Sequence, residues 1–454
     1  MYANSRKFIE RQNLRNPWFA DPIFYICLYF VFQLYPFIRI PFVVSAILIL
    51  GFFVTAFAQG NKVNPFHRTA VFWFCIGYSL FFVYMYAFVG HGYRYSNMVF
   101  GYAFLRYVPE FLMGLYIANR RSGLFPVVGT ILLMCAFTGA LSLAFNIEYY
   151  TETGGSALRD RKEILKYTQG TGETREMDAM GIIGVGAAAA RAYLFAICFG
   201  YFLAIKRFLK PFVSFVFTGL LSVMLISTIL SGLTVPLALC GIAILGYAIL
   251  RVRRISSVII SIAMAGAFGV GTFASYKFNL TVFTQYFDKA WNIVTRLTGT
   301  GGYVEEINRY RLFMLSWDTF VSNPIFGVGG RTGIHGVGGV MIGGHSGLAD
   351  TLGQFGLIGS LGFIILFIYA IRTLYKVTKS EKGNPMGSFY FTFLVFFGMF
   401  FIHSFVNPTL GTYSITQVLL LVFGLMMGLV RNKKPFTAIM PPPKYVNPVH
   451  LRGR

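Results

Sequence analysis

The sequence predicts an all-α polytopic membrane protein with about twelve transmembrane helices and a large outer loop, and three observations support this fold class. Hydrophobic residues make up 56% of the 454 residues and charged residues only 12%, a balance typical of chains that fold in lipid. Apolar runs such as 70–89 and 181–205 are long enough to cross about 30 Å of hydrocarbon as helices. The third observation is the position of the basic residues between these runs.

The apolar runs are expected to be helices because an unpaired backbone group is too costly in lipid. Their approximate bounds are 22–38, 41–59, 69–89, 98–118, 124–145, 181–205, 211–230, 232–250, 255–275, 351–371, 388–405 and 408–430. Three sections follow from this pattern. Residues 1–275 hold the first nine spans and a periplasmic loop near 146–180, residues 276–350 form a large periplasmic loop with interfacial helices, and residues 351–454 hold the last three spans and a basic cytoplasmic tail.

The formal net charge of +23 is explained by membrane topology and needs no nucleic-acid partner. With the N-terminus inside, every inner segment is short and positive, and most of the 39 lysines and arginines lie in these segments, as the positive-inside rule requires. Both termini are therefore expected on the cytoplasmic side of the cell inner membrane. The basic N-terminal segment leads into Pro22 without a small-residue cleavage pattern, so we expect it to be retained.

Neither the cysteines nor the histidines predict a metal or a cofactor. All five cysteines fall inside predicted spans without a C-x-x-C pair, which argues against disulfides and zinc. His91, His335 and His403 are predicted on the outer side, but no H-x-H or H-x-x-x-H spacing joins them. The carboxylates of the large loop include no Asp-x-Asp pair.

The two outer loops differ in content. The loop near 146–180 is polar and mixed in charge, and of two interpretations, a lid or a spacer, we favour the spacer. In the large loop, apolar residues at helical spacing over 283–294, around Trp291, predict a helix that lies on the membrane surface. A second helix is expected over 308–321, because the residue before Pro324 resists helical geometry.

Glycines near the end of the large loop do not predict a nucleotide site. The glycine-rich segment 327–344 follows no strand and lacks the lysine and hydroxyl of a P-loop, so we expect a flexible or re-entrant segment. Gly353, Gly356, Gly359 and Gly362 recur every third residue in the tenth span, which favours close helix packing over a ligand site.

The end of the large loop resembles the carboxy-terminal signature of the O-antigen ligase and polysaccharide polymerase superfamily. Residues 309–329 read RYRLFMLSWDTFVSNPIFGVG and residues 345–359 read HSGLADTLGQFGLIG. The matching elements are Arg309 before the NPIFGVG turn, the pair His345-Ser346, and the GLIG that follows. The family usually has asparagine after the histidine, and Ser346 departs from this pattern. The local match covers about fifty residues, and the long outer loop before the last three spans extends the resemblance across most of the chain.

The resemblance implies transfer of a glycan from undecaprenyl diphosphate to an acceptor hydroxyl at the outer face, by inversion and without metal, in a fold like the membrane-embedded (GT-C) glycosyltransferases. The leading interpretation is a polymerase of O-antigen, capsule or exopolysaccharide. The alternatives are a ligase that transfers glycan to lipid A core and, from another class, a flippase or transporter of lipid-linked oligosaccharides. The implied partners are the lipid-linked donor, a glycan or lipid acceptor and membrane lipids; a chain-length regulator is left open.

Three arginines are candidates for binding the diphosphate, because a guanidinium group binds phosphate oxygens bidentately and stays charged. Arg309 and Arg311 are two residues apart, so on a helix they point in different directions, and we favour Arg309 as the primary ligand. Arg191 interrupts a small-residue run of the sixth span, where an uncompensated charge costs roughly 3 kcal/mol, and it resembles the superfamily arginines that contact the diphosphate. The alternatives are contacts with phosphate headgroups for Arg309 and Arg311, a pair with Asp318 for Arg311, and an ion pair for Arg191.

His345 is the candidate for handling the acceptor proton and, with Arg309, completes the predicted catalytic pair. Imidazole titrates near neutral pH, and His345 stands where the loop re-enters the membrane. Because a sugar hydroxyl is weakly acidic, it stays open whether His345 takes the proton directly, only orients the hydroxyl, or accepts the proton late. Arg106 and Glu110, four residues apart in the fourth span, are interpreted as a structural pair.

Overall fold

The computed structural model describes residues 18–34, 42–58, 96–120, 122–153, 185–230, 234–251, 304–328, 346–381, 385–406, 413–431 and 439–447, together with residues 73, 77 and 80. In this part of the chain the regular structure is helical, and an isolated antiparallel bridge between Leu209 and Val446 is the only β-type contact among these residues. The predicted all-helical class is confirmed for the described residues.

Helices coincide with the predicted spans wherever the chain is described in full. They are α2 (Pro22–Leu34), α3 (Phe42–Ala58), α5 (Ser96–Asn119), α6 (Leu124–Thr153), α9 (Val185–Ile205), α10 (Pro211–Leu230), α11 (Thr234–Arg251), α15 (Gly347–Ser380), α16 (Pro385–Val406) and α17 (Tyr413–Arg431). The predicted spans 69–89 and 255–275 lie mostly or wholly outside the described residues.

Several of these helices are suited to a membrane by length and composition. Among the described residues, four stretches are long and apolar enough to cross a bilayer, namely Leu124–Phe145, Ala188–Phe208, Pro211–Ile229 and Pro385–Phe405. The two parts of α15, bent by 43°, make a fifth if they are counted as one span. Shorter apolar stretches lie in α2, α3, α11 and α17. These helices support a helical membrane protein.

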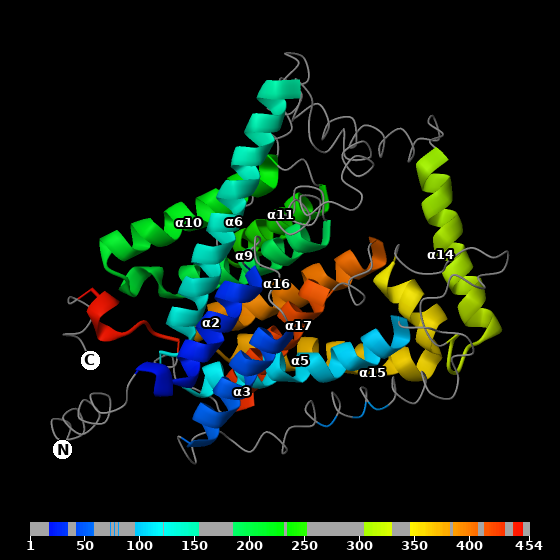
Figure 1. The fold of residues 1–454 in the computed structure, drawn as a ribbon, viewed down its shortest axis with the longest axis horizontal. Coiled ribbons are helices and arrows are strands. Elements are labelled where there is room, and N and C mark those ends of the chain that lie inside the picture. The colour runs from blue at the N-terminus through cyan, green and yellow to red at the C-terminus, as the bar shows by residue number, and fades with distance from the viewer. Residues whose placement is uncertain are drawn as a thin grey trace.

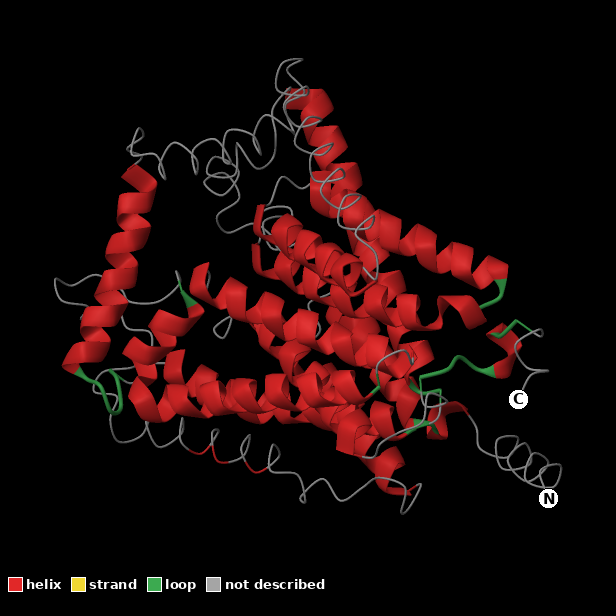
Figure 2. Ribbon diagram, turned by 180° about the vertical axis from the view of Figure 1, so that it is seen from behind, coloured by secondary structure: helices red, strands yellow, loops and turns green. Residues whose placement is uncertain are grey.

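The helices form a bundle with distinct ends (Figure 1). α5, α15, α16 and α17 run along the long axis of the molecule, α5 packed on α17 and α15 on α16. The short helices η1 (Trp18–Ala20) and η6 (Pro443–Tyr445) lie at one end of these helices. In both views α14 (Val304–Ser322) lies across the opposite end (Figures 1 and 2).

α5 and α17 approach each other backbone to backbone through two glycines. A Cβ atom on Gly114 would overlap the carbonyl of Leu421, and a Cβ atom on Gly424 would overlap the carbonyl of Phe111. Small residues permit such close approach and the dispersion contacts that hold helices together in lipid. Fully buried aromatic rings of α16 and α17 fill the bundle beside this contact. They are Phe389, Phe393, Phe396, Phe397, Phe400 and Phe423.

Two helices differ in detail from the pattern expected from the sequence. The apolar stretch of α6, Leu124–Phe145, has the bounds predicted for the fifth span, but the helix itself continues to Thr153. No glycine or proline interrupts 146–153, and Gly154-Gly155 follow, so the sequence offers no earlier stop. The glycines of α15 were expected to mark close helix packing, and Gly356 does approach another backbone closely, at Ile325, but with φ +62° it also breaks the helix. Its left-handed backbone suits glycine.

The C-terminal segment folds back as a strap on the end of the bundle opposite α14. Ile439 is fully buried, and its carbonyl accepts a hydrogen bond from the Tyr201 hydroxyl at 2.8 Å. Val446 bridges to Leu209 after α9, and the ring of Tyr445 stacks on Phe125 of α6 with centroids 4.9 Å apart. The strap therefore joins the ends of α6 and α9.

Candidate functional site

The turn after α14 docks on the break in α15. The N–H of Leu357 donates to the carbonyl of Pro324 at 2.8 Å, and the N–H of Ile358 donates to the carbonyl of Ile325 at 3.1 Å. In return, the carbonyl of Gly353 accepts from the N–H of Val328 at 3.1 Å. A helix break leaves such groups without intrahelical partners, and buried backbone groups need partners. The NPIFGVG turn supplies them.

Two glycines make this docking possible. Gly327 in the turn and Gly356 in α15 have φ of +67° and +62°, a region that residues with a Cβ atom rarely adopt. A Cβ atom on Gly356 would overlap the carbonyl of Ile325, and one on Gly327 would meet the backbone of Gln354 at 2.5 Å. The FGVG and GLIG elements of the sequence motif are thus in direct contact.

A buried carboxylate joins α14 to the first turn of α15. Asp350, 5% exposed, accepts from the Ser316 hydroxyl of α14 at 2.8 Å and from the N–H of Ser346 at 3.1 Å. Ser346 is the N-cap of α15, since its hydroxyl oxygen accepts from the N–H of Ala349. The same hydroxyl donates to the carbonyl of Ser404 at the end of α16, at 3.2 Å. Three helices meet at this junction.

The junction gives Ser346 a role that the motif left open, and sequence reasoning missed Asp350. The usable signal was a serine followed in the next turn by an acidic residue, which is typical of a helix start. His345 is the residue before this cap and lies outside the described residues.

The predicted helix over 308–321 is confirmed as α14, which begins four residues earlier, at Val304. The backbone of Arg309 and Arg311 belongs to it, while both side chains lie outside the description. Residues seven apart share a helix face. Position 309 is therefore on the side of Ser316, which faces α15, and position 311 is on the side of the exposed Asp318.

Arg191 is buried in α9 without a hydrogen-bonding partner. The residue is 7% exposed, and its Nε and Nη1 atoms have no hydrogen-bond partner in the described part of the chain. The thiols of Cys135 in α6 and Cys240 in α11 lie close enough to interact with it electrostatically. The alternative of an ion pair with a neighbouring helix finds no support among these residues. The arginine lies six residues after Val185, within two turns of the start of α9.

Two residues further along α9, Tyr193 contacts a histidine of α16. The Tyr193 hydroxyl lies 3.0 Å from Nδ1 of His403, and both side chains are buried. Nε2 of His403 is also buried and has no hydrogen-bond partner among the described residues. His403 directly precedes Ser404, the residue that receives the hydroxyl of Ser346. The sequence showed no pattern around His403, because its partner lies far away in the chain.

A second buried carboxylate lies between α2, α5 and α17. Glu110 Oε1 accepts from the hydroxyl of Tyr29, and the amide nitrogen of Gln417 donates to the same oxygen at 2.8 Å and to the Tyr29 hydroxyl at 3.0 Å. The side chain of Arg106, expected to pair with Glu110, lies outside the description. The contacts with Tyr29 and Gln417 support a structural role for Glu110, because they hold three helices together.

The structure does not bring all predicted site residues into one place. Arg191 makes no hydrogen bond or ion pair with α14 or α15 in the described residues, although α9 reaches the junction through Tyr193, His403 and α16. Among the described residues no cluster of three or more His, Cys, Asp or Glu could hold a metal.

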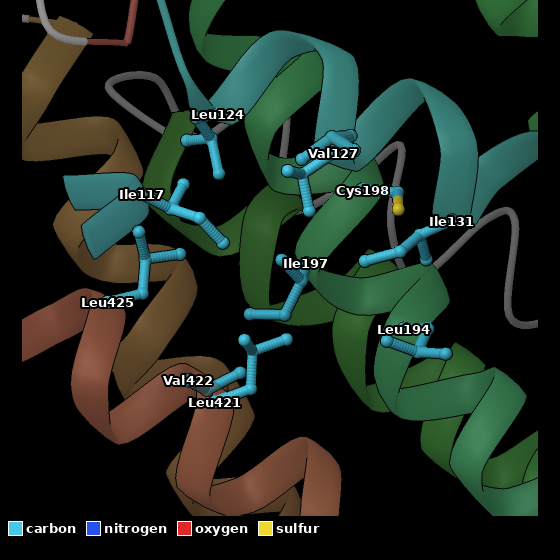
Figure 3. Close-up of a pocket in the computed structure, with 11 residues that line it drawn as sticks. Ile117, Leu124, Val127, Ile131, Leu194, Ile197, Cys198, Leu421, Val422 and Leu425 are labelled. Atoms are coloured by element: carbon cyan, nitrogen blue, oxygen red, sulfur yellow. The ribbon is translucent and has the colours of Figure 1, made fainter. Parts of the chain in front are cut away.

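The pocket in Figure 3 lies between α5, α6, α9 and α17. Aliphatic side chains and Cys198 line it, so apart from one thiol it offers no polar side chain to a substrate.

Comparison with known proteins does not identify a relative. No family model matches the chain, and no curated protein matches it.

Proposed function

We propose that this protein transfers a glycan from a polyprenyl diphosphate to an acceptor hydroxyl at the outer face of the cytoplasmic membrane, as a polysaccharide polymerase. The observation that carries the proposal is Arg191, a buried arginine in an apolar, small-residue helix, whose Nε and Nη1 atoms have no hydrogen-bond partner among the described residues. A charge left unpaired in a membrane span is costly and marks a functional site. A diphosphate near the start of α9 would supply the missing partner and would gain from the helix dipole.

The arrangement around α14 supports a second diphosphate contact. Position 309 faces the side of α14 that packs on α15, and position 311 faces the exposed side, which favours Arg309 over Arg311. The acceptor oxygen attacks the anomeric carbon while the bond from that carbon to the phosphate oxygen breaks, so the configuration inverts. Arginine cations stabilise the charge that develops on the leaving diphosphate. The acceptor proton passes to His345, next to the cap of α15, or to the leaving phosphate.

The proposal includes about twelve spans, a GT-C-like architecture and both termini in the cytoplasm. The position of the terminal segments supports this topology, because η1 and η6 lie at the end of the bundle opposite α14 (Figure 1). That arrangement suits a chain with its terminal segments inside and its large loop outside.

The experiment is an in vitro transfer assay with the purified protein, a lipid-diphosphate oligosaccharide and a chelator. Arg191→Gln is expected to lower turnover about 100-fold or more, the usual cost of removing a group that stabilises transition-state charge. The turnover of Arg191→Lys should lie between those of the unchanged protein and Arg191→Gln, because lysine keeps the charge but loses the bidentate geometry. The matched control is Arg372→Gln, an exposed arginine of α15, which should leave turnover unchanged.

The thermal stability of the free protein separates this role from a structural one. Removing an unpaired buried charge should leave stability unchanged or raise it, whereas breaking an ion pair should lower it. A fully active Arg191→Gln, or activity that needs a divalent metal, would contradict the arginine-based mechanism. A product ladder from lipid-linked repeats supports a polymerase, and transfer only to lipid A core supports the ligase alternative.

A flippase for lipid-linked oligosaccharides is the second candidate, favoured by the break in α15 at Gly356. Broken helices near binding sites are frequent in transporters. In cells that carry Arg191→Gln, transfer predicts single repeat units on the outer leaflet. Transport predicts that these units accumulate on the inner leaflet.

A further inference from the structure

α14 carries a row of exposed apolar side chains, while two of its polar side chains are buried. Phe313, Trp317 and Val321, spaced four residues apart, are 37%, 42% and 59% exposed. Ser316 and Thr319 face inward and are buried. A water-soluble surface helix turns its apolar stripe inward. The outward stripe of α14, defined by Phe313, Trp317 and Val321, therefore needs an apolar medium.

The inward polar residues of α14 are satisfied where they are. Ser316 donates to Asp350, and the Thr319 hydroxyl donates to the carbonyl of Leu315 at 2.7 Å. Rotating α14 to bury the stripe would break the bond to Asp350 and bring apolar residues against a carboxylate. The rotation of the helix is thus set by its contacts with α15.

The stripe continues onto the outward side of α15. Ile325 and Phe326 of the turn are exposed, and the hydrogen bond from Ile358 to Ile325 joins them to the exposed apolar residues of α15. These are Leu357, Ile358, Leu361, Ile365 and Ile368. If the two parts of α15 are counted as one span, the helix is long and apolar enough to cross a bilayer. Its outward side would then meet acyl chains, and the continuous surface would carry the same lipid up to α14.

The position of α14 leaves its outward side open. The helix lies across the end of the bundle, crosswise to α5, α15, α16 and α17 (Figures 1 and 2). One flank of the stripe carries the exposed polar residues Asp318 and Ser322. A helix with an apolar face beside a polar one is the pattern that lies at the boundary of headgroups and acyl chains.

We infer that α14 is an interfacial helix whose Phe313–Trp317–Val321 stripe is inserted into the outer leaflet of the bilayer, with the Asp318–Ser322 flank at the level of the headgroups. The occupant of this surface is lipid. The inference holds independently of the reaction proposed above, since it rests only on the exposure and position of α14.

Trp317 is a native probe for the test. The full-length protein with Trp18, Trp73 and Trp291 changed to Phe is reconstituted in vesicles of phosphatidylethanolamine and phosphatidylglycerol. The lipids carry bromine either near the glycerol or near the chain end. The expected result is quenching about two-fold stronger by the shallow label than by the deep one, with weak quenching by aqueous acrylamide. The matched control moves the probe to the polar flank, as Ser322→Trp with Trp317→Phe, and should reverse the preference towards acrylamide.

Two results would overturn the inference. Strong quenching of Trp317 by acrylamide without lipid quenching would show that the stripe faces water. Protection from both quenchers would show that protein covers it, as a second copy or another partner. If the tryptophan replacements prevent folding, a nitroxide on Val321→Cys gives the same comparison, because greater access to oxygen than to a water-soluble nickel complex supports insertion and the reverse excludes it.

Discussion

Replacing Asp350 by asparagine tests whether the junction of α14, α15 and α16 holds the site together. The carboxylate accepts from the Ser316 hydroxyl at 2.8 Å through Oδ1 and from the N–H of Ser346 at 3.1 Å through Oδ2. An amide keeps one accepting oxygen and turns an NH₂ group towards the other donor. The loss of one hydrogen bond to a charged group, with a buried donor left unsatisfied, costs about 2 kcal/mol. That equals a factor of about 30 in an equilibrium between docked and undocked α14.

The free energy of unfolding in detergent and the rate of glycan transfer are both measured. Asp350→Asn should lose about 2 kcal/mol of stability, whereas Asp318→Asn, which changes an exposed carboxyl of α14, should lose less than about 0.5 kcal/mol. The loss of transfer rate in Asp350→Asn should not add to the loss in His345→Ala, because the junction is expected to act on the rate by positioning His345, the residue next to the cap. Equal effects of the two asparagine variants would refute the junction, and additive rate losses would refute its link to His345.

Two further predictions concern the stability of the fold. Gly356→Ala should lower the free energy of unfolding by about 1–3 kcal/mol, because alanine is strained at its φ of +62° and its Cβ would overlap the carbonyl of Ile325. The control Gly219→Ala, at a position with open space around it, should leave stability unchanged or raise it. Equal shifts of the unfolding temperature in the two variants would contradict the strain at Gly356. Glu110→Leu should cost about 1–3 kcal/mol because it removes the acceptor of Tyr29 and Gln417. Glu110→Gln keeps that oxygen and should unfold at a higher temperature than the leucine variant.

The positions of helices were predictable because hydrophobicity along the chain is a one-dimensional signal. α10 at Pro211–Leu230 has the bounds predicted for it, since Pro211 begins an apolar run that follows a basic connection. Helix ends were less predictable where no glycine or proline gave a stop, as at the end of α6. The end of α14 near Asn323-Pro324 was predictable because proline restricts the residue before it.

The candidate site was predictable only in part. Arg191 stood out because a charge in an apolar run is costly, but its lack of a partner depends on which side chains of α6 and α11 face it. The contact of Tyr193 with His403 joins residues more than two hundred positions apart, and no local spacing reports it.

The sequence by itself determined a helical chain suited to lipid, the approximate bounds of its helices, and the arginines and histidine worth testing, because composition and periodicity act locally. Only the tertiary structure decided that Gly356 breaks α15 to receive the NPIFGVG turn, that Asp350 joins α14 to the cap at Ser346, and that the stripe of α14 faces outward. Each of these depends on hydrogen bonds and packing between separate elements, and such partners are chosen by the fold as a whole.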